Sequence, residues 1–230
     1  MIIGGLQKTS LLDYPDCISA IIWTQGCNFR CPFCYNKSLI LEKTKGIPED
    51  ELFSFLEKRQ GMIEGVVVSG GEPLIQPDIV EFITKIKQRG YLVKIDTNGS
   101  CPEKLKDLLE KRLVDYVAMD VKAPKGKYPQ LTGVKPDVAL VEQSITLIKD
   151  KAPMYEFKTT VVPELLKKED VVEISKWIKG AKRYYLQQFK HDVPLLSAKL
   201  ERLQPYTKEQ LLEIAQAVQQ YVECCTVRGV

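Results

Sequence analysis

Three cysteines are spaced closely enough to hold one metal centre. Cys27, Cys31 and Cys34 form a C-x-x-x-C-x-x-C pattern directly after an apolar, strand-like run over residues 18–23. Cysteine thiolates in a short loop are typical ligands of iron–sulfur clusters. Three ligands leave one iron of a four-iron cluster without a protein partner, and an open metal position is where a substrate or cofactor binds.

Zinc and redox chemistry are the alternatives for these cysteines. Thiolates two to four residues apart also build zinc sites, but a structural zinc site needs a fourth ligand. The one histidine, His191, lies far away in the sequence, and no second pair of closely spaced cysteines forms a knuckle. A thioredoxin-like pair of Cys31 and Cys34 would leave Cys27 unexplained. The spacing therefore favours an iron–sulfur cluster and leaves the other two readings open.

The remaining sulfur and imidazole groups are interpreted as structural. A free cysteine behaves first as a small buried apolar residue and only second as an accessory thiol. A lone histidine in a loop is more often structural than catalytic. These interpretations apply to Cys17, Cys101, Cys224, Cys225 and His191.

A glycine pair and a glutamate follow the next apolar run. Gly70, Gly71 and Glu72 come directly after residues 65–69. Glycines let the backbone approach a ligand closely, and a glutamate beside them can accept charge-assisted hydrogen bonds from an ammonium group. The alternative is an ordinary turn with Glu72 in solvent.

Charged residues also mark three later apolar segments. Asp96 and Thr97 end one segment, in a composition that suits a ribose, a cation, a helix cap or a plain turn. Asp120 and Lys122 lie two residues apart, so both side chains point to the same side of a strand. Lys158 interrupts an apolar run, and it either reaches a ligand carboxylate or extends to solvent.

The elements that must position these residues alternate along the chain. Strand-like runs cover residues 18–23, 65–69, 91–96, 115–120, 155–162 and 183–189, and helical patterns cover 48–59, 77–89, 102–111, 136–150, 167–179 and 207–221. Such alternation predicts parallel βαβ units. Six units fit an α/β fold of the partial (β/α)6 TIM-like barrel type, whose active site lies at the carboxyl ends of the strands. No repeat or linker divides the chain, so residues 1–230 are predicted to form a single domain.

Composition restricts the partners and the compartment. Lys and Arg number 33 against 30 Asp and Glu, a net charge of +3 that is too balanced to favour nucleic acid or a membrane as the main partner. The amino terminus lacks a basic start followed by a long apolar run, and no apolar stretch is long enough to span a membrane. The sequence predicts a cytoplasmic protein, where thiols stay reduced.

Together these residues resemble the radical S-adenosylmethionine (SAM) superfamily. The resemblance covers residues 4–189 and is carried by C-x-x-x-C-x-x-C joined to Gly-Gly-Glu at the next strand end. Residues 4–15 and 24–36 are similar in amino-acid sequence to the activating enzymes of glycyl-radical enzymes. They most resemble the activating proteins of anaerobic ribonucleoside-triphosphate reductase, with pyruvate formate-lyase activase a near relative.

The resemblance implies a set of cofactor ligands. The three loop cysteines would hold a [4Fe-4S] cluster, and SAM would chelate the open iron through its amino and carboxylate groups. Phe33 would contact the adenine, and the Gly-Gly-Glu segment would hold the methionine ammonium. Positions that match cofactor or monovalent-cation contacts in activases are Asp96, Thr97, Asp120 and Lys122, and the pocket would be completed by Lys158 and Val162.

The resemblance also implies an activity and partners. A 5′-deoxyadenosyl radical would remove a hydrogen atom from a glycine of a glycyl-radical enzyme, with electrons from a flavodoxin- or ferredoxin-like donor. The alternative is a radical SAM enzyme that acts on a small molecule. Two features depart from relatives: no cysteine lies between Cys34 and Gly70 to hold extra clusters there, and Gln187 and Gln188 precede His191 where pyruvate formate-lyase activase has a histidine near the end of strand six.

Alanine in place of Cys27, Cys31 or Cys34 is expected to abolish the release of 5′-deoxyadenosine from SAM after reconstitution without air. Each change removes one of the three thiolates on which cluster binding depends. Chromatographic measurement of the nucleoside checks this expectation. Undiminished release from any of the three variants would contradict it.

Overall fold

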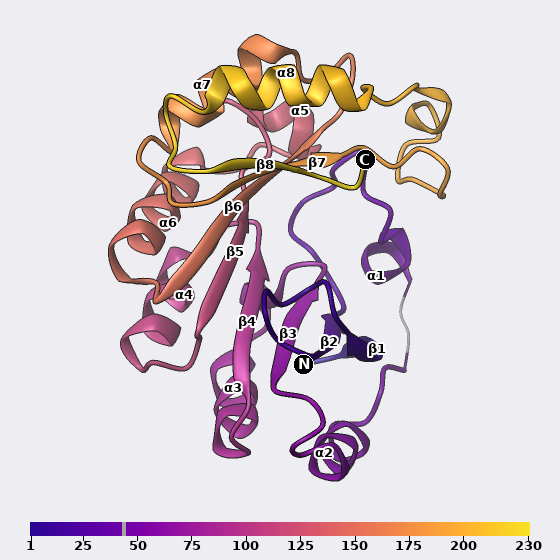
Figure 1. Ribbon diagram of the computed structural model, residues 1–230. Helices are drawn as coiled ribbons and strands as arrows, with labels where there is room; N and C mark the ends of the chain where they lie inside the picture. Colours follow the sequence, from indigo (N-terminus) through magenta and orange to yellow (C-terminus); the bar gives the residue numbers. More distant parts are fainter. Residues whose placement is uncertain (43–44) are drawn as a thin grey trace.

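The protein is built on one curved eight-stranded sheet. The computed structural model describes residues 1–42 and 45–230. The strands follow one another across the sheet in chain order, and their arc is visible in Figure 1. They are β1 (Ile3–Ser10), β2 (Ser19–Thr24), β3 (Gly65–Gly70), β4 (Leu92–Thr97), β5 (Tyr116–Asp120), β6 (Met154–Val161), β7 (Tyr184–Gln188) and β8 (Cys225–Arg228).

Helices connect the parallel strands and cover the outside of the arc (Figure 1). Among the described residues, every helix is too short or too polar to cross a bilayer. The α-helices are α1 (Lys37–Leu41), α2 (Glu49–Lys58), α3 (Ile79–Gln88), α4 (Pro102–Glu110), α5 (Tyr128–Thr132), α6 (Val138–Lys151), α7 (Lys168–Trp177) and α8 (Lys208–Val218). Three short 3₁₀ turns are η1 (Pro73–Ile75), η2 (Lys125–Lys127) and η3 (Leu200–Arg202).

Each adjacent pair of strands from β2 to β8 is parallel, and β1 is antiparallel to β2. Six of them, β2 to β7, are each followed by helix, which confirms the predicted α/β architecture of the partial (β/α)6 type. No pairing joins β1 to β8 in the described part of the chain, so the arc remains open between these two strands.

Side-chain alternation separates the outer core from the barrel interior. On β3, Val66 and Val68 belong to the large core under the helices, whereas Val67 belongs to a small inner cluster. The helices bury matching stripes, as α3 does with Ile79, Phe82, Ile83 and Ile86. Because side chains two residues apart share a face, Ser69 follows Val67 on the inner face of β3, and Asp120 follows Ala118 on that of β5.

The connection between β1 and β2 closes the amino-terminal end of the barrel. Tyr14 packs edge-on against Tyr116, the first residue of β5, with ring centroids 5.8 Å apart. A side chain on Gly65, the first residue of β3, would lie 2.9 Å from the Tyr14 ring and 3.0 Å from Cys17 Sγ. Tyr14 is 1% exposed and fills this end of the barrel with its ring.

Strands β1 and β8 were not predicted, because each owes its conformation to a neighbour. β1 carries three exposed residues in succession and gains its hydrogen bonds from β2. β8 is four residues long and pairs with β7. The interpretation of Cys224 as a buried apolar residue is wrong, since its side chain is exposed just before β8. Cys17, Cys101 and Cys225 are only partly buried.

An ion pair with a buried carboxylate fixes β8 to the barrel interior. Glu156 on β6 is 1% exposed and accepts two hydrogen bonds from the Arg228 guanidinium, of 2.8 and 3.0 Å, and one of 2.8 Å from the Tyr116 hydroxyl. The guanidinium also stacks on Tyr185, 3.2 Å from the ring centroid. Bidentate geometry of this kind gives both strength and a defined orientation, so the last strand is held at its carboxyl end.

Replacement of Arg228 by methionine is expected to lower the free energy of unfolding by about 2 kcal/mol. The change leaves the Glu156 carboxylate buried without its cation, a loss that typically costs about 3–5 kcal/mol when both partners are fully buried; Arg228 keeps 36% of its side chain exposed, which reduces the cost. Urea denaturation measures the effect. The R228M/E156Q double variant removes the buried charge but keeps an acceptor for the Tyr116 hydroxyl. It should recover most of the loss, and a double variant no more stable than R228M would contradict this explanation.

Candidate cluster and cofactor site

One cavity of about 420 Å³ lies at the carboxyl ends of the strands and collects nearly all of the predicted site residues. Its volume is in the range of pockets for small molecules and cofactors. The predicted residues that line it are Cys27, Cys31, Phe33, Cys34, Gly70, Gly71, Glu72, Asp96, Thr97, Asp120, Lys122 and Lys158. The prediction for Val162 is not met, because this side chain is fully buried in the core under the helices and is not among the cavity's lining residues.

The cysteine loop is held by hydrogen bonds from distant parts of the backbone. The Arg30 amide donates to the carbonyl of Thr132 at 2.7 Å, at the end of α5. The Leu196 amide donates to the carbonyl of Cys34 at 2.9 Å. Both contacts come from segments more than a hundred residues further along the chain, so the loop conformation depends on the tertiary fold.

The glycine pair is packed directly against the start of the cysteine loop. Gly71 N donates to the Thr24 carbonyl at 3.0 Å, and Glu72 N donates to the Gly26 carbonyl at 2.9 Å. A side chain on Gly71 would lie 1.9 Å from the Gly26 oxygen, and one on Gly70, whose φ is +128°, would lie 2.3 Å from Thr24 N. Only glycine fits at these positions, and the two segments together form one wall of the cavity.

Glu72 is a buried junction between two strand ends. It is 1% exposed and accepts hydrogen bonds from Leu74 N at 3.0 Å, Thr97 Oγ1 at 2.8 Å and Asn98 N at 2.7 Å. Burial raises the pKa of its carboxyl group to about 7, although these hydrogen bonds act in the opposite direction. The alternative of a solvated Glu72 is therefore wrong. Three of its roughly four acceptor positions are filled within the protein.

The three thiols face the cavity in an apolar setting. Burial raises the pKa of Cys27 to about 11 and that of Cys31 to about 12, and it raises the pKa of Cys34 as well. The nearby Lys122 ammonium works against this rise at all three. Cysteines bind metals as thiolates, so loading this site must release protons.

The arrangement of the three thiols fits a metal cluster better than a single metal ion. Within residues 1–42 and 45–230, no three Cys, His, Asp or Glu side chains are grouped as ligands of one metal ion. The three thiols instead line one cavity with a glycine wall and a cationic side. Each thiolate of a [4Fe-4S] cluster binds a different iron, so three thiols that line one cavity fit such a cluster.

A chain of charged side chains runs from Lys94 on β4 to Lys122 just after β5, and four of its five members, Asp96, Lys158, Asp120 and Lys122, line the cavity. Lys94 Nζ lies 3.0 Å from Asp96 Oδ1, and Lys122 Nζ lies 3.3 Å from Asp120 Oδ1. Lys158 Nζ stands between the two aspartates, 3.4 Å from Asp96 Oδ2 and 3.7 Å from Asp120 Oδ2. Burial would lower the pKa of Lys158, but the attraction of both aspartates outweighs burial and holds the pKa above its ordinary value.

Several residues of the site were missed by reasoning from the sequence. Lys94 and Ser69 had a usable signal, because each lies on the same strand face as a predicted residue. Ser69 donates to Asp96 Oδ2 at 3.2 Å. No strand pattern in the sequence pointed to Asp13, because it lies in the loop between β1 and β2. It lines the cavity from this loop, and its backbone carbonyl accepts a hydrogen bond from Lys94 Nζ at 2.7 Å. Tyr35 joins the cavity wall directly after the last cysteine of the motif.

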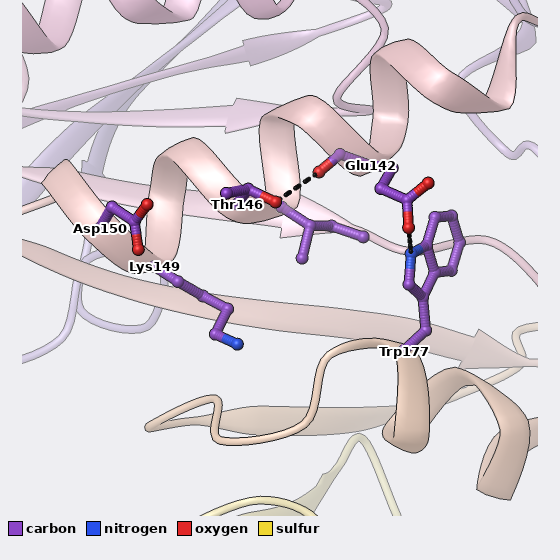
Figure 2. A pocket seen from close by; sticks show the side chains of 6 residues that line it. Glu142, Thr146, Lys149, Asp150 and Trp177 are labelled. Carbon is purple, nitrogen blue, oxygen red and sulfur yellow. Dashed lines mark hydrogen bonds between the residues drawn. The ribbon is translucent and has the colours of Figure 1, made fainter.

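A second hollow of about 110 Å³ lies on the outside of the molecule, between α6 and α7 (Figure 2). Two hydrogen bonds join groups that line it: Trp177 Nε1 donates to Glu142 at 3.3 Å, and Thr146 donates to the Glu142 carbonyl at 3.1 Å (Figure 2). None of its lining residues lines the large cavity. The large cavity is therefore the candidate site.

Comparisons of sequence identify relatives of the chain. Residues 21–178 match the profile of the radical SAM superfamily. A protein of Methanocaldococcus jannaschii, named as a candidate glycyl-radical enzyme activating enzyme, is 32% identical over 100% of this chain and 96% of its own length. The pyruvate formate-lyase-activating enzyme of Staphylococcus epidermidis is 30% identical over 76% of this chain and 74% of its own length.

Comparisons of structure agree on the fold. Streptococcus suis SuiB bound to precursor peptide SuiA superimposes with a TM-score of 0.70 over 91% of this chain and 48% of that chain, at 16% identity. A domain of pyruvate-formate lyase-activating enzyme from Bacteroides vulgatus gives a TM-score of 0.54 over 72% of this chain and 99% of that chain, at 14% identity. At such identities the likeness extends to the fold alone.

Replacement of Gly71 by alanine is expected to reduce the amount of cluster that the protein retains after reconstitution. The new methyl group would meet the Gly26 carbonyl, a backbone atom that cannot move aside, and overpacking of this kind costs about 1–3 kcal/mol. Iron and sulfide analysis measures cluster content. The control is G126A, because a side chain at Gly126 meets no atom within 4 Å; equal cluster content in the two variants would contradict the expectation.

Proposed function

This chain belongs to the radical SAM superfamily, and we propose that it is an activating enzyme that installs a glycyl radical on a partner protein. The proposal treats residues 1–230 as one radical SAM domain acting in the cytoplasm, as composition and cysteine usage predict. The observation that carries it is the convergence of three thiols, a glycine wall and a chain of lysines and aspartates on one cavity. Similarity over the whole chain to a relative named for this activity supports it.

We assign cofactor roles to the cavity residues by their chemistry. Cys27, Cys31 and Cys34 would hold the [4Fe-4S] cluster, and Phe33 would offer an apolar face to the adenine. Lys122 and Lys158, the lysines of the charged chain that line the cavity, would attract the SAM carboxylate. When bound, the cluster and SAM supply a 5′-deoxyadenosyl radical that can take a hydrogen atom from carbon.

The ammonium of SAM would be held by the Gly70–Gly71 segment more than by the Glu72 side chain. Both glycines line the cavity and, lacking side chains, let a ligand approach their backbone groups. Glu72 already accepts three hydrogen bonds from the protein and has about one acceptor position left. Its main contribution would be to hold the ends of β3 and β4 together.

The open side of the arc supports a protein partner. In the described residues, β1 and β8 do not pair, so the sheet is not closed between its first and last strands. Extended segments of other proteins commonly bind beside an unpaired sheet edge, and we propose that the glycine-bearing segment of the partner approaches the cavity from its rim. Tyr35 and Lys190 stand at the rim, with the Lys190 ammonium 5.6 Å from the Tyr35 ring centroid.

The partner that the sequence favours is an anaerobic ribonucleoside-triphosphate reductase, with a flavodoxin- or ferredoxin-like protein as electron donor. This finer assignment rests on the resemblance of residues 4–15 and 24–36 to the activating proteins of that reductase. A pyruvate formate-lyase is the second candidate partner, because its activating enzyme in Staphylococcus epidermidis is 30% identical to this chain. A monovalent cation beside the cofactor stays a prediction of the resemblance.

Incubation of the reconstituted protein with SAM, a reductant and an anaerobic ribonucleotide reductase is expected to give a glycine-centred doublet in the electron paramagnetic resonance spectrum. A partner with its radical glycine replaced by alanine should give none, and neither should the C31A variant of this chain. A pyruvate formate-lyase is tested in parallel. Release of 5′-deoxyadenosine with no doublet from either partner would defeat the proposal and favour a small-molecule substrate.

A further inference from the structure

The position of Lys158 bears on whether the site takes up a metal cation. Each aspartate of the charged chain turns one oxygen to a lysine of its own and the other to Lys158. Lys94 faces Oδ1 of Asp96, and Lys122 faces Oδ1 of Asp120. Both Oδ2 atoms face the Lys158 ammonium, at 3.4 and 3.7 Å. The ammonium thus occupies the space between the two carboxylates.

The backbone fixes this arrangement. In the register of β5 and β6, Lys158 is the partner of Asp120, so the two side chains leave the sheet side by side. Asp96 projects from β4, on the other side of β5, and is steadied by Ser69, which donates to its Oδ2. The Lys158 side chain is only 13% exposed, so its ammonium has little water in place of these partners.

The charges of these five side chains also disfavour a bound metal cation. Counted by themselves, the five linked side chains Lys94, Asp96, Lys158, Asp120 and Lys122 carry one positive charge in excess. A sodium or potassium ion binds carboxylate and carbonyl oxygens, as hard cations do. In this cavity, a sodium or potassium ion would have to displace Lys158 or enter a group of side chains that is already positive. Placing buried like charges together is strongly unfavourable.

We infer that the Lys158 ammonium takes the place of the monovalent cation that the resemblance implies, so that this cavity binds SAM without sodium or potassium. Lys158 is then a positioning residue: it holds Asp96 and Asp120 at a fixed spacing, and the excess positive charge remains available for a carboxylate. The inference deepens the proposed function and depends on it only for the identity of the ligand.

The test compares NaCl, KCl and choline chloride at equal ionic strength. The full chain with its cluster reconstituted is titrated with SAM by calorimetry, and the melting temperature of the full chain is recorded in the same salts without SAM. The wild-type protein is expected to show SAM affinities within two-fold of one another and melting temperatures that do not depend on the cation. The K158M variant should gain saturable stabilisation by Na⁺ or K⁺ over choline, and its SAM affinity should rise at least several-fold with the same ion.

Two controls separate this effect from a general loss of an ion pair. K158R keeps a cation between the aspartates and should remain indifferent to the salt. K87M removes a lysine that pairs with Asp115 at 2.8 Å outside the cavity, and it should also remain indifferent. If K158M does not fold, K158Q makes the same comparison.

Saturable stabilisation of the wild-type protein by Na⁺ or K⁺ would overturn the inference. So would a folded K158M or K158Q that stays indifferent to both ions, because the space between the aspartates would then not be a cation site. Failure of SAM to bind in any salt would count against the proposed function, and the melting temperatures without SAM would still decide the role of Lys158.

Discussion

The site depends on the direct contact between two backbone segments, the glycine pair at the end of β3 and the start of the cysteine loop. A side chain at Gly71 would occupy the position of the Gly26 carbonyl, so the two segments touch with no side chain between them. Two hydrogen bonds join them, from Gly71 N and Glu72 N. This contact places the thiols beside the end of β3, where they line the same cavity as the polar residues of the other strand ends.

The charged interior is the second constraint on the fold. Burying an isolated charge is very unfavourable, and each charge must find partners of opposite sign with good geometry. Asp96 and Asp120 satisfy this condition through Lys158, which contacts both. Deeper in the barrel, Glu156 satisfies it through Arg228 and Tyr116. The polar residues of the inner face therefore position one another before any cofactor is present.

The open barrel links this interior to the surface. β8 is short, yet it is anchored at Arg228 by a bidentate bond to a buried carboxylate. The strand can thus form an edge of the sheet without a partner on its outer side in the described residues. The anchored last strand leaves the sheet unclosed between β1 and β8, which suits a site whose proposed substrate is a segment of another protein.

The sequence by itself determined the six βα units, the cysteine motif and the residues at the strand ends, because period-two alternation and short-range spacing are local properties. Only the tertiary structure decided what those residues do. Glu72 proved to be a junction of strand ends, Val162 a core residue, and Lys158 a bridge between Asp96 and Asp120. Asp13 and β8 could not be anticipated either, because their environments come from strands distant in the chain, and the contacts that define them exist only when the sheet has formed.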